Sequence, residues 1–340
     1  MKNPKRILLL AILGVLAAFA VLTVQRYVVR AARVQQANAT APYFPAGALW
    51  TQPMQQAPVD PQSSAIIQWL ADHGAWGYGM RFQVDFSMRV LSADASTPRV
   101  PFHKGSTWFA ADSDAVSSIP LPRNGGLEGE NDYHCGGGDC HLIVADRSAQ
   151  KLYEAWQANY ANGALSATEL TVWDLSRIYP PSGRGNQCTS ADAAGLPIAP
   201  LLFNADEIAA GHIDHAIRFA LPNNKIRARV FVHPATHAGS PRGPELAPPM
   251  GVLLRLKPDF DMSKLTPAAQ VVARALQKYG MYLSDGGNIA LTAQNDADTN
   301  TKYSDVGFDS HSLFPIKVTD FEVVKIPFLI SQTNDCVRNK

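Results

Sequence analysis

Short apolar runs separated by turn residues constrain the fold of this chain more than any other feature of its sequence. Residues 141–146 and 151–156 are two such runs, and the four residues between them, Arg-Ser-Ala-Gln, suit a tight turn. Two strand-like runs joined by so short a turn predict a β-hairpin.

The same pattern continues through the rest of the chain. Residues 281–283 and 289–292 flank a Ser-Asp-Gly-Gly turn and predict a second hairpin. Further strands are expected at 170–175, 212–220, 228–233, 251–257 and 321–326. Many short strands with Gly and Pro turns predict a mainly β fold, specifically an antiparallel β-sandwich or jelly roll.

Two or three peripheral helices are expected beside the strands. Residues 266–279 give the clearest helical signal, because Thr266 suits the N-cap, Pro267 the first turn and Gly280 the left-handed stop. Residues 63–73 are a second candidate. The sequence Asn-Ala-Asp-Glu at 204–207 resembles a capping box that opens one helical turn.

The N-terminus has the features of a membrane segment. Residues 7–24 form a run of eighteen without a charge, preceded by Lys2, Lys5 and Arg6. As a helix this run would span about 27 Å, close to the hydrocarbon thickness of a bilayer. We therefore expect residues 1–34 to be a transmembrane anchor, with a cleaved signal segment ending near the Ala-Asn-Ala sequence at 37–39 as the alternative.

The remainder divides into a linker and one large domain. Residues 35–62 are rich in Ala, Pro and Gln and predict an extended linker, and residues 63–340 predict an exported β-rich domain. The anchor reading places this domain in the periplasm or extracellular space, tethered to the membrane; the signal reading makes the protein secreted.

The distribution of charge excludes some partners. Residues 1–34 hold six of the 30 basic residues and none of the 29 acidic ones, so the rest of the chain carries a net charge of −5. A mildly acidic body is unsuited to phosphate backbones, and we expect no nucleic-acid partner. The sequence has no phosphate-binding loop and no dinucleotide fingerprint, so no cofactor is expected.

Four cysteines, Cys135, Cys140, Cys188 and Cys336, all lie in the part expected to be exported. An even number in an oxidising compartment predicts two disulfides, although the sequence leaves the three possible pairings open. Cys135 and Cys140 enclose three glycines and would close a small loop. A metal site formed with the adjacent His134 and His141 is the less favoured alternative.

Strand alternation points to Glu154 as a candidate proton donor. In the strand 151–156 it shares a face with Leu152 and Trp156. A carboxyl between apolar neighbours has a raised pKa, and an adjacent indole offers a sugar-stacking surface. The alternative is a surface glutamate at a sheet edge.

The same alternation in residues 212–220 places His215 with apolar neighbours, as a proton-transfer group or as a buried structural imidazole. His212, Asp214 and Arg218 fall on the opposite face, which we expect to be solvated. Asp192 and Glu207 are candidates for a second carboxylate.

Three histidines raise the possibility of a metal site. His215 lies within the predicted strand 212–220, His233 ends the strand 228–233 and His237 follows it. The three could converge from adjacent strand ends. No acidic ligand is fixed by spacing, so no metal is assigned.

Several motifs together resemble a family of exported bacterial proteins of uncertain function. The resemblance spans about residues 43–325, and its most specific part is Thr-Ser-Ala-Asp-Ala-Ala-Gly-Leu-Pro at 189–197. The other motifs lie at 141–144, 152–156, 173–175, 211–219, 234–237, 251–257 and 279–285. Residues 288–293 depart from the aromatic-rich continuation typical of the family. The resemblance implies an exported bacterial protein and supplies no reaction.

These features favour a carbohydrate-active protein that cleaves an envelope or extracellular polysaccharide. The expected catalytic residues are Glu154, His215, Asp192 and Glu207, and the expected substrate-binding residues are Trp156, His141, His237 and Trp173. A non-catalytic, lectin-like or partner-binding ectodomain is the alternative, and a metal-dependent hydrolase is the third hypothesis.

Overall fold

The computed structural model describes residues 42–105, 107–333 and 335–339. The predicted anchor or signal segment, 1–34, lies outside the described residues, as does the start of the predicted linker. Within the described ranges, no helix combines the length and apolarity needed to cross a membrane.

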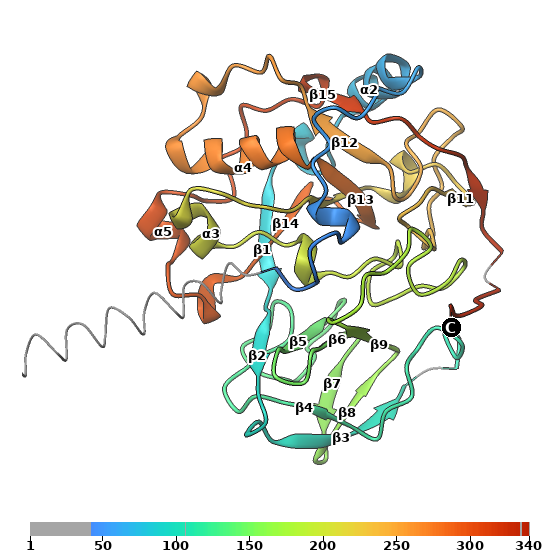
Figure 1. Ribbon diagram of the computed structural model, residues 1–340, viewed down its shortest axis with the longest axis vertical. Coiled ribbons are helices and arrows are strands. Elements are labelled where there is room, and N and C mark those ends of the chain that lie inside the picture. Colours follow the sequence, from blue (N-terminus) through green and yellow to red (C-terminus); the bar gives the residue numbers. More distant parts are fainter. Residues whose placement is uncertain (1–41, 106, 334, 340) are drawn as a thin grey trace, which may run out of the picture. The chain divides into compact units, whose positions relative to one another are not determined.

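The larger β-sheet has six strands in the order β1-β14-β10-β13-β12-β15 (Figure 1). The strands are β1 (Val84–Met88), β14 (Leu291–Gln294), β10 (Ile217–Leu221), β13 (Met281–Gly286), β12 (Leu253–Leu256) and β15 (Phe321–Val323). β1 runs parallel to β14 and β10 parallel to β13, while the other pairs are antiparallel. A separate antiparallel pair is formed by β11 (Val230–Phe231) and β16 (Ile330–Ser331).

Two four-stranded sheets form a smaller body of the same compact unit. One contains β2 (Leu91–Ala93), β5 (Leu142–Asp146), β6 (Lys151–Trp156) and β9 (Glu169–Asp174). The other contains β4 (Ser118–Pro120), β3 (Arg99–Lys104), β8 (Ala164–Ala167) and β7 (Asn159–Ala161). A small hydrophobic core that includes Phe102, Leu142 and Leu165 packs these sheets together.

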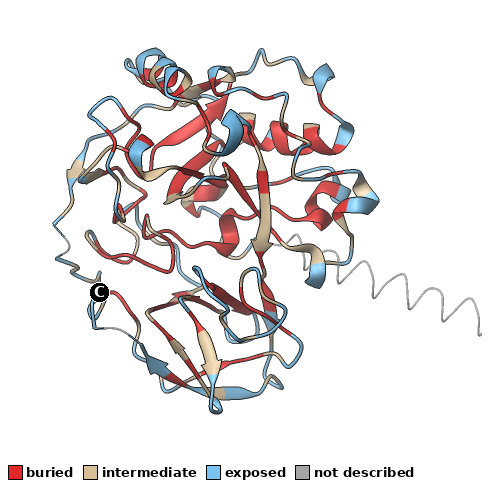
Figure 2. Ribbon diagram, turned by 180° about the vertical axis from the view of Figure 1, so that it is seen from behind, coloured by how far each residue is buried: buried red, intermediate tan, exposed pale blue. Residues whose placement is uncertain are grey.

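The β5–β6 hairpin separates the two hydrophobic cores of the protein. Its strands pair antiparallel along their whole length, as the sequence predicts. Leu152 belongs to the large core and Tyr153 to the small one, so the alternating side chains serve opposite faces. Both faces are covered, which explains why every residue of β5 is buried (Figure 2).

Four α-helices surround the larger sheet, together with seven short 3₁₀ helices. The α-helices are α2 (Ser63–Asp72), α3 (Ala205–Ala210), α4 (Pro267–Lys278) and α5 (Tyr303–Val306). The 3₁₀ helices are η1 (Leu49–Thr51), η2 (Tyr78–Met80), η3 (Ala199–Leu201), η4 (Asn223–Lys225), η5 (Met262–Lys264), η6 (Asp296–Asp298) and η7 (Val318–Asp320). The counts refer to residues 42–339 without the two undescribed positions inside that range.

The helix ends confirm the capping signals read from the sequence. The Thr266 hydroxyl accepts a hydrogen bond from the Ala269 N–H at the start of α4. Asn204 and Glu207 form a reciprocal capping box at α3, and Gly211 ends that helix with φ of 83°.

The fold is mainly β, as expected, but its sheets are mixed rather than purely antiparallel. The predicted second hairpin is wrong, because β13 and β14 are separated by β10, which pairs with both. The connecting loop crosses the end of β10, where the Gly287 N–H donates to the Leu221 carbonyl. The Asp-Gly-Gly sequence therefore marks a crossing loop rather than a reversal between neighbours.

Residues 42–62 pack onto the domain instead of forming the extended linker that their composition predicts. Phe44, Ala48 and Trp50 are buried in the large core, and η1 forms within this segment. Two aromatic side chains, Phe44 and Trp50, anchor the segment to the core. The prediction of a linker considered the overall composition of the segment and did not weigh these two residues.

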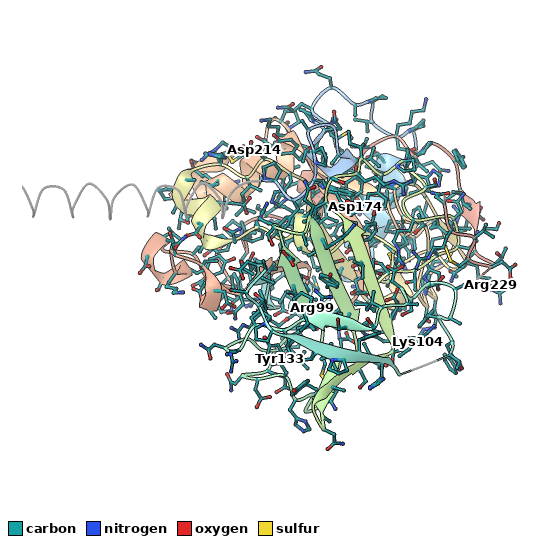
Figure 3. The ribbon with its side chains drawn as sticks, turned by 60° about the horizontal axis from the view of Figure 1, so that its bottom comes forward. Arg99, Lys104, Tyr133, Asp174, Asp214 and Arg229 are labelled. Carbon is teal, nitrogen blue, oxygen red and sulfur yellow. A yellow bond between two sulfur atoms is a disulfide. The ribbon has the colours of Figure 1, made fainter. Side chains whose placement is uncertain are left out.

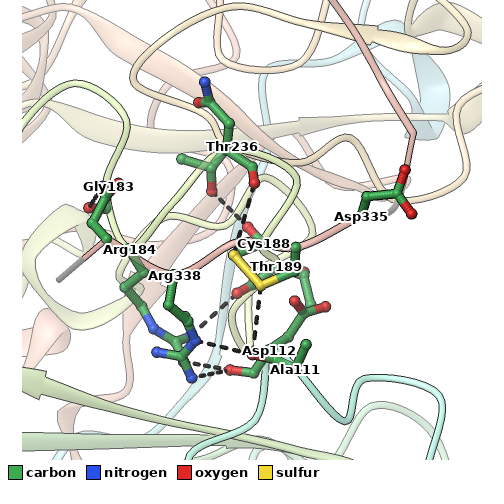
Figure 4. Close-up of a disulfide and its surroundings, with 12 residues drawn as sticks. Ala111, Asp112, Gly183, Arg184, Cys188, Thr189, Thr236, Asp335 and Arg338 are labelled. Carbon is green, nitrogen blue, oxygen red and sulfur yellow. Dashed lines mark hydrogen bonds between the residues drawn. A yellow bond between two sulfur atoms is a disulfide. The ribbon is translucent and has the colours of Figure 1, made fainter.

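Two disulfides join the four cysteines, which confirms the expected number. Cys135 bonds to Cys140 within the glycine-rich loop, and Cys188 bonds to Cys336 across 148 residues of sequence (Figure 4). Such bonds persist in oxidising compartments and are consistent with an extracellular or periplasmic domain.

Candidate functional site

A pocket of about 260 Å³ opens where the smaller body meets the larger sheet. Asp139, His141 and Trp156 contribute to it from the β5–β6 hairpin and the preceding loop. Asn223 and Asp285 contribute from the ends of β10 and β13. The remaining lining residues are Phe109, Thr189, Ser190, Ala191, Ala193, His237, Gly239, Ser240 and Gly286. A concave site between two packed bodies, with a few converging polar groups, is the usual form of a ligand site.

Two carboxylates line the pocket, Asp285 and Asp139. Asp285 Oδ2 lies 3.1 Å from Nη2 of Arg218, and Oδ1 accepts the Gly286 N–H at 2.7 Å. Asp139 Oδ1 accepts the indole N–H of Trp156 at 3.1 Å. Each carboxylate is thus oriented by a donor. The Asp285 side chain is 27% exposed to solvent.

Arg218 is a buried cation next to the pocket, and it bonds to the lining residue Asp285. Its Nη2 also donates to Asp192 Oδ1 at 2.6 Å, while Nε donates to Ser284 Oγ and Nη1 to Thr292 Oγ1, both at 3.2 Å. The expectation that Arg218 lies on a solvated face is wrong, because β10 is an interior strand buried on both faces. The adjacent Asp192 and Asp285 carboxylates raise the pKa of Arg218 despite its burial, so it remains charged.

Asp192 lies behind the pocket, between the lining residues Ala191 and Ala193, and its side chain is fully buried. Desolvation raises its pKa to about 7, against the opposing effect of Arg218. Its second oxygen, Oδ2, is buried and has no hydrogen-bond partner among the described residues. Burial therefore disfavours the charged form of Asp192, while the ion pair with Arg218 favours it.

His141 gives the pocket wall a fixed positive charge. Nδ1 donates to Glu128 Oε2 at 2.6 Å and Nε2 donates to the Ala191 carbonyl at 2.9 Å. Desolvation lowers the pKa of His141, but the bond to Glu128 outweighs it and the pKa rises to about 9. Both ring nitrogens are therefore engaged in hydrogen bonds within the protein.

The apolar part of the pocket is aromatic. Phe109 and Trp156 meet edge to face, with ring centroids 6.1 Å apart. The predicted substrate-binding residues Trp156, His141 and His237 all line the pocket. His237 accepts the Gly239 N–H at Nδ1 and contacts Gln332 through Nε2, at 3.0 and 3.2 Å.

Glu154 and Trp173 do not line this pocket. Glu154 is fully buried, where its Oε1 accepts the N–H groups of Ile198 and Ala199 and its Oε2 accepts the Trp173 indole N–H. Desolvation raises the pKa of Glu154, and three donors satisfy its oxygens. The inward orientation inferred from strand alternation is present, but the side chain joins β6 to η3 instead of facing a ligand.

His215 and Glu207 form a pair at the end of α3, outside the pocket lining. His215 Nε2 lies 3.1 Å from Glu207 Oε1, and Nδ1 donates to the Ala216 carbonyl. Glu207 also accepts the Asn204 N–H in the capping box. The structure therefore does not bring Glu154, His215 and His237 together. The neighbouring His212 and Asp214 are exposed as expected, and Figure 3 shows Asp214 at the periphery.

The histidines proposed as metal ligands are also separated. His233 Nε2 bonds to Asn186 Oδ1 at 2.8 Å, whereas His215 pairs with Glu207 and His237 lines the pocket. Within the described part of the chain, the one group with metal-ligand spacing is Asp112, Cys188 and Cys336. Its two sulfurs form a disulfide and are not thiolate ligands.

Sequence reasoning missed the two pocket carboxylates and the buried ion pairs that support the site. Asp285 ends a strand and Asp139 lies in the disulfide loop, and polar residues at such loop positions often carry function. Glu128 gives no local signal, because its partner His141 is supplied by a different turn of the chain. Comparison with protein-family models, curated proteins and solved structures gave no match.

Replacing Asp192 with Asn should change how stability depends on pH. The native pKa of about 7 lies above the unfolded value of 3.8, so the wild type loses stability as pH rises from about 4 to 7, by a few kcal/mol. An amide does not titrate, so the stability of D192N relative to wild type should rise across that window and level off above it. Urea unfolding at several pH values measures this difference; a constant difference would contradict the raised pKa.

Replacing Glu128 with Gln tests the charged state of His141. The pKa of His141 rises from 6.5 to about 9, so its contribution is complete below pH 6.5 and lost through pH 9. The pKa of Glu128 falls from 4.5 to about 2, so its contribution is complete above pH 4.5 and lost through pH 2. E128Q should therefore lower the free energy of unfolding most between pH 4.5 and 6.5, by about 3 kcal/mol. Equal destabilisation at pH 5.5 and pH 10 would show that His141 is neutral.

Glu154→Ala should destabilise the fold, because it leaves the Trp173 indole and two backbone N–H groups without an acceptor. We expect a loss of about 3 kcal/mol in unfolding free energy; Trp173→Phe should also destabilise, because it removes one donor to Glu154 and leaves a cavity in the core. Chemical denaturation measures both. Unchanged stability of E154A would argue against the structural role assigned here.

Proposed function

We propose that this chain is an exported carbohydrate-active protein that binds a sugar of an envelope or extracellular polysaccharide in this pocket and cleaves the adjacent glycosidic bond. The N-terminal apolar segment would direct export and tether the domain. The observation that carries the proposal is the meeting of two carboxylates, Asp139 and Asp285, with an aromatic surface in one pocket of about 260 Å³.

Each part of the pocket matches a feature of sugar binding. The rings of Trp156 and Phe109 provide an apolar surface for the C–H face of a pyranose, and the indole N–H adds a polar edge. Ser190, Asn223 and Ser240 supply hydroxyl and amide groups for hydrogen bonds to sugar hydroxyls. Glycines at 239 and 286 make room for the neighbouring side chains of Ala193 and Asn223, which also line the pocket.

The two carboxylates support cleavage by general acid and base chemistry. Arg218 and the Gly286 N–H both donate to Asp285 and orient its carboxylate, so we assign it the role of base. Asp139, which accepts the Trp156 indole N–H, is assigned the role of acid as the second carboxylate of the pocket. Asp139 would give a proton to the glycosidic oxygen while water attacks the anomeric carbon and Asp285 accepts the water proton, so that one water is consumed per bond broken.

A lectin-like binding function is the second candidate. It is favoured by the position of Glu154 and His215, two of the expected catalytic groups, away from the pocket lining. Binding needs the aromatic surface and the polar rim but not an oriented carboxylate pair.

The decisive comparison uses purified full-length protein and a panel of envelope and extracellular polysaccharides. Reducing-end release measures turnover, and retention on the insoluble polysaccharides measures binding. Asp285→Asn should lower turnover by about 10²-fold or more and leave binding intact. Trp156→Ala should weaken both. Asp214→Asn, an exposed carboxylate with 61% side-chain exposure, is the matched control and should behave as wild type.

The possible results separate the two candidates. Full turnover by D285N would remove Asp285 from catalysis. Binding by the wild type without turnover of any polysaccharide would support the lectin-like function instead. A wild type that retains none of the polysaccharides would overturn the assignment of this pocket to carbohydrate.

A further inference from the structure

An exposed tryptophan stands at the rim of the pocket. The Trp108 side chain is 89% exposed, the highest value among the large apolar residues of the described chain. It directly precedes Phe109, which lines the pocket and contacts Trp156. Neighbouring Cα atoms are about 3.8 Å apart, so the backbone of Trp108 lies directly beside a residue of the pocket lining.

We infer that the pocket is one subsite of a longer glycan site, which continues outward across Trp108. This inference rests on the proposed function and narrows its substrate to chains of at least two sugars. The aromatic residues become more exposed from inside to outside: Trp156 and Phe109 are half-buried, whereas Trp108 faces solvent. A sugar chain with one unit in the pocket would find a second apolar face at its exit.

The turn that carries Trp108 and Phe109 is held in place by local hydrogen bonds. The N–H groups of Asp112 and Ser113 donate to the Phe109 carbonyl at 3.1 and 2.9 Å. Lys104, at the end of β3 in Figure 3, reaches the same carbonyl at 3.5 Å. The turn is therefore defined by its own backbone and by the strand before it.

Residues of the C-terminal segment also form hydrogen bonds to this turn. Arg338 Nε donates to the Ala111 carbonyl at 3.0 Å, and its Nη2 bonds to Asp114 Oδ1 at 2.8 Å. The sulfur of Cys336 lies 3.5 Å from the Ala111 carbonyl oxygen and is bonded to Cys188 (Figure 4).

The Cys188–Cys336 disulfide links the C-terminal segment, which bonds to the Trp108 turn, to the residue that precedes the lining residues Thr189 and Ser190. Fixing two walls before the ligand arrives reduces the ordering cost of binding. Large exposed aromatic groups near a binding site commonly contribute to recognition, and the backbone of the turn that carries Trp108 is held by these hydrogen bonds.

The test measures affinity as a function of glycan length. The probes are soluble oligosaccharides of one to six units from β-1,4-glucan, β-1,3-glucan and β-1,4-linked N-acetylglucosamine, titrated calorimetrically into full-length protein, with the Asp285→Asn background used for any probe that the wild type cleaves. Affinity of the wild type should rise about tenfold or more between one unit and three. Trp108→Ala should lose about tenfold for the longer probes and leave the affinity for the single sugar unchanged.

Phe328→Ala is the control, because Phe328 is also an exposed aromatic residue, at 57%, and does not line the pocket. It should match wild type for every probe, and circular dichroism should show both variants folded. Probes that bind with an affinity independent of length, or a W108A protein that equals wild type, would overturn the outer subsite while leaving the pocket assignment standing. Failure of every probe to bind would overturn the pocket assignment and the subsite with it.

Discussion

One guanidinium group, that of Arg218, holds together the parts of the protein that form the site. It lies on the interior strand β10 and bonds to side chains of β13 and β14 and to Asp192 of the loop that follows the disulfide-bonded Cys188. A buried cation is costly unless its donors are satisfied, and here two carboxylates and two hydroxyls satisfy them. The position of Asp285 in the pocket depends on this network.

The pocket itself is a consequence of two cores meeting at one sheet. The β5–β6 hairpin buries one set of side chains in the large core and the alternate set in the small one. Where the hairpin ends, Trp156 and His141 emerge beside the loops of the larger sheet. The Glu128–His141 and Asp192–Arg218 ion pairs lie next to the pocket. Both are largely buried, so the electrostatic interactions within them are stronger than in water.

Local signals in the sequence predicted local structure well. The β5–β6 hairpin, the capped ends of α3 and α4 and the number of disulfides follow from short-range chemistry, and the structure confirms them. Strand alternation also gave the inward direction of Glu154. Strand alternation does not show which segment covers the inward face. In the structure η3 covers it, at the position where a ligand was expected.

Long-range pairing accounts for the remaining differences. Whether Arg218 faces water depends on β10 having a neighbour on each side and packed layers above and below, which no short window of sequence specifies. The insertion of β10 between β13 and β14 likewise requires partners from distant segments. Residues such as Asp285 and Asp139, from different turns of the chain, become a pair of pocket carboxylates only in the folded protein.

The most direct measurement is a crystal structure of the D285N protein with a bound oligosaccharide. A sugar ring stacked on Trp156, with its glycosidic oxygen between Asp139 and position 285, is the arrangement expected here. A sugar bound elsewhere on the surface, with this pocket holding only water, would contradict it.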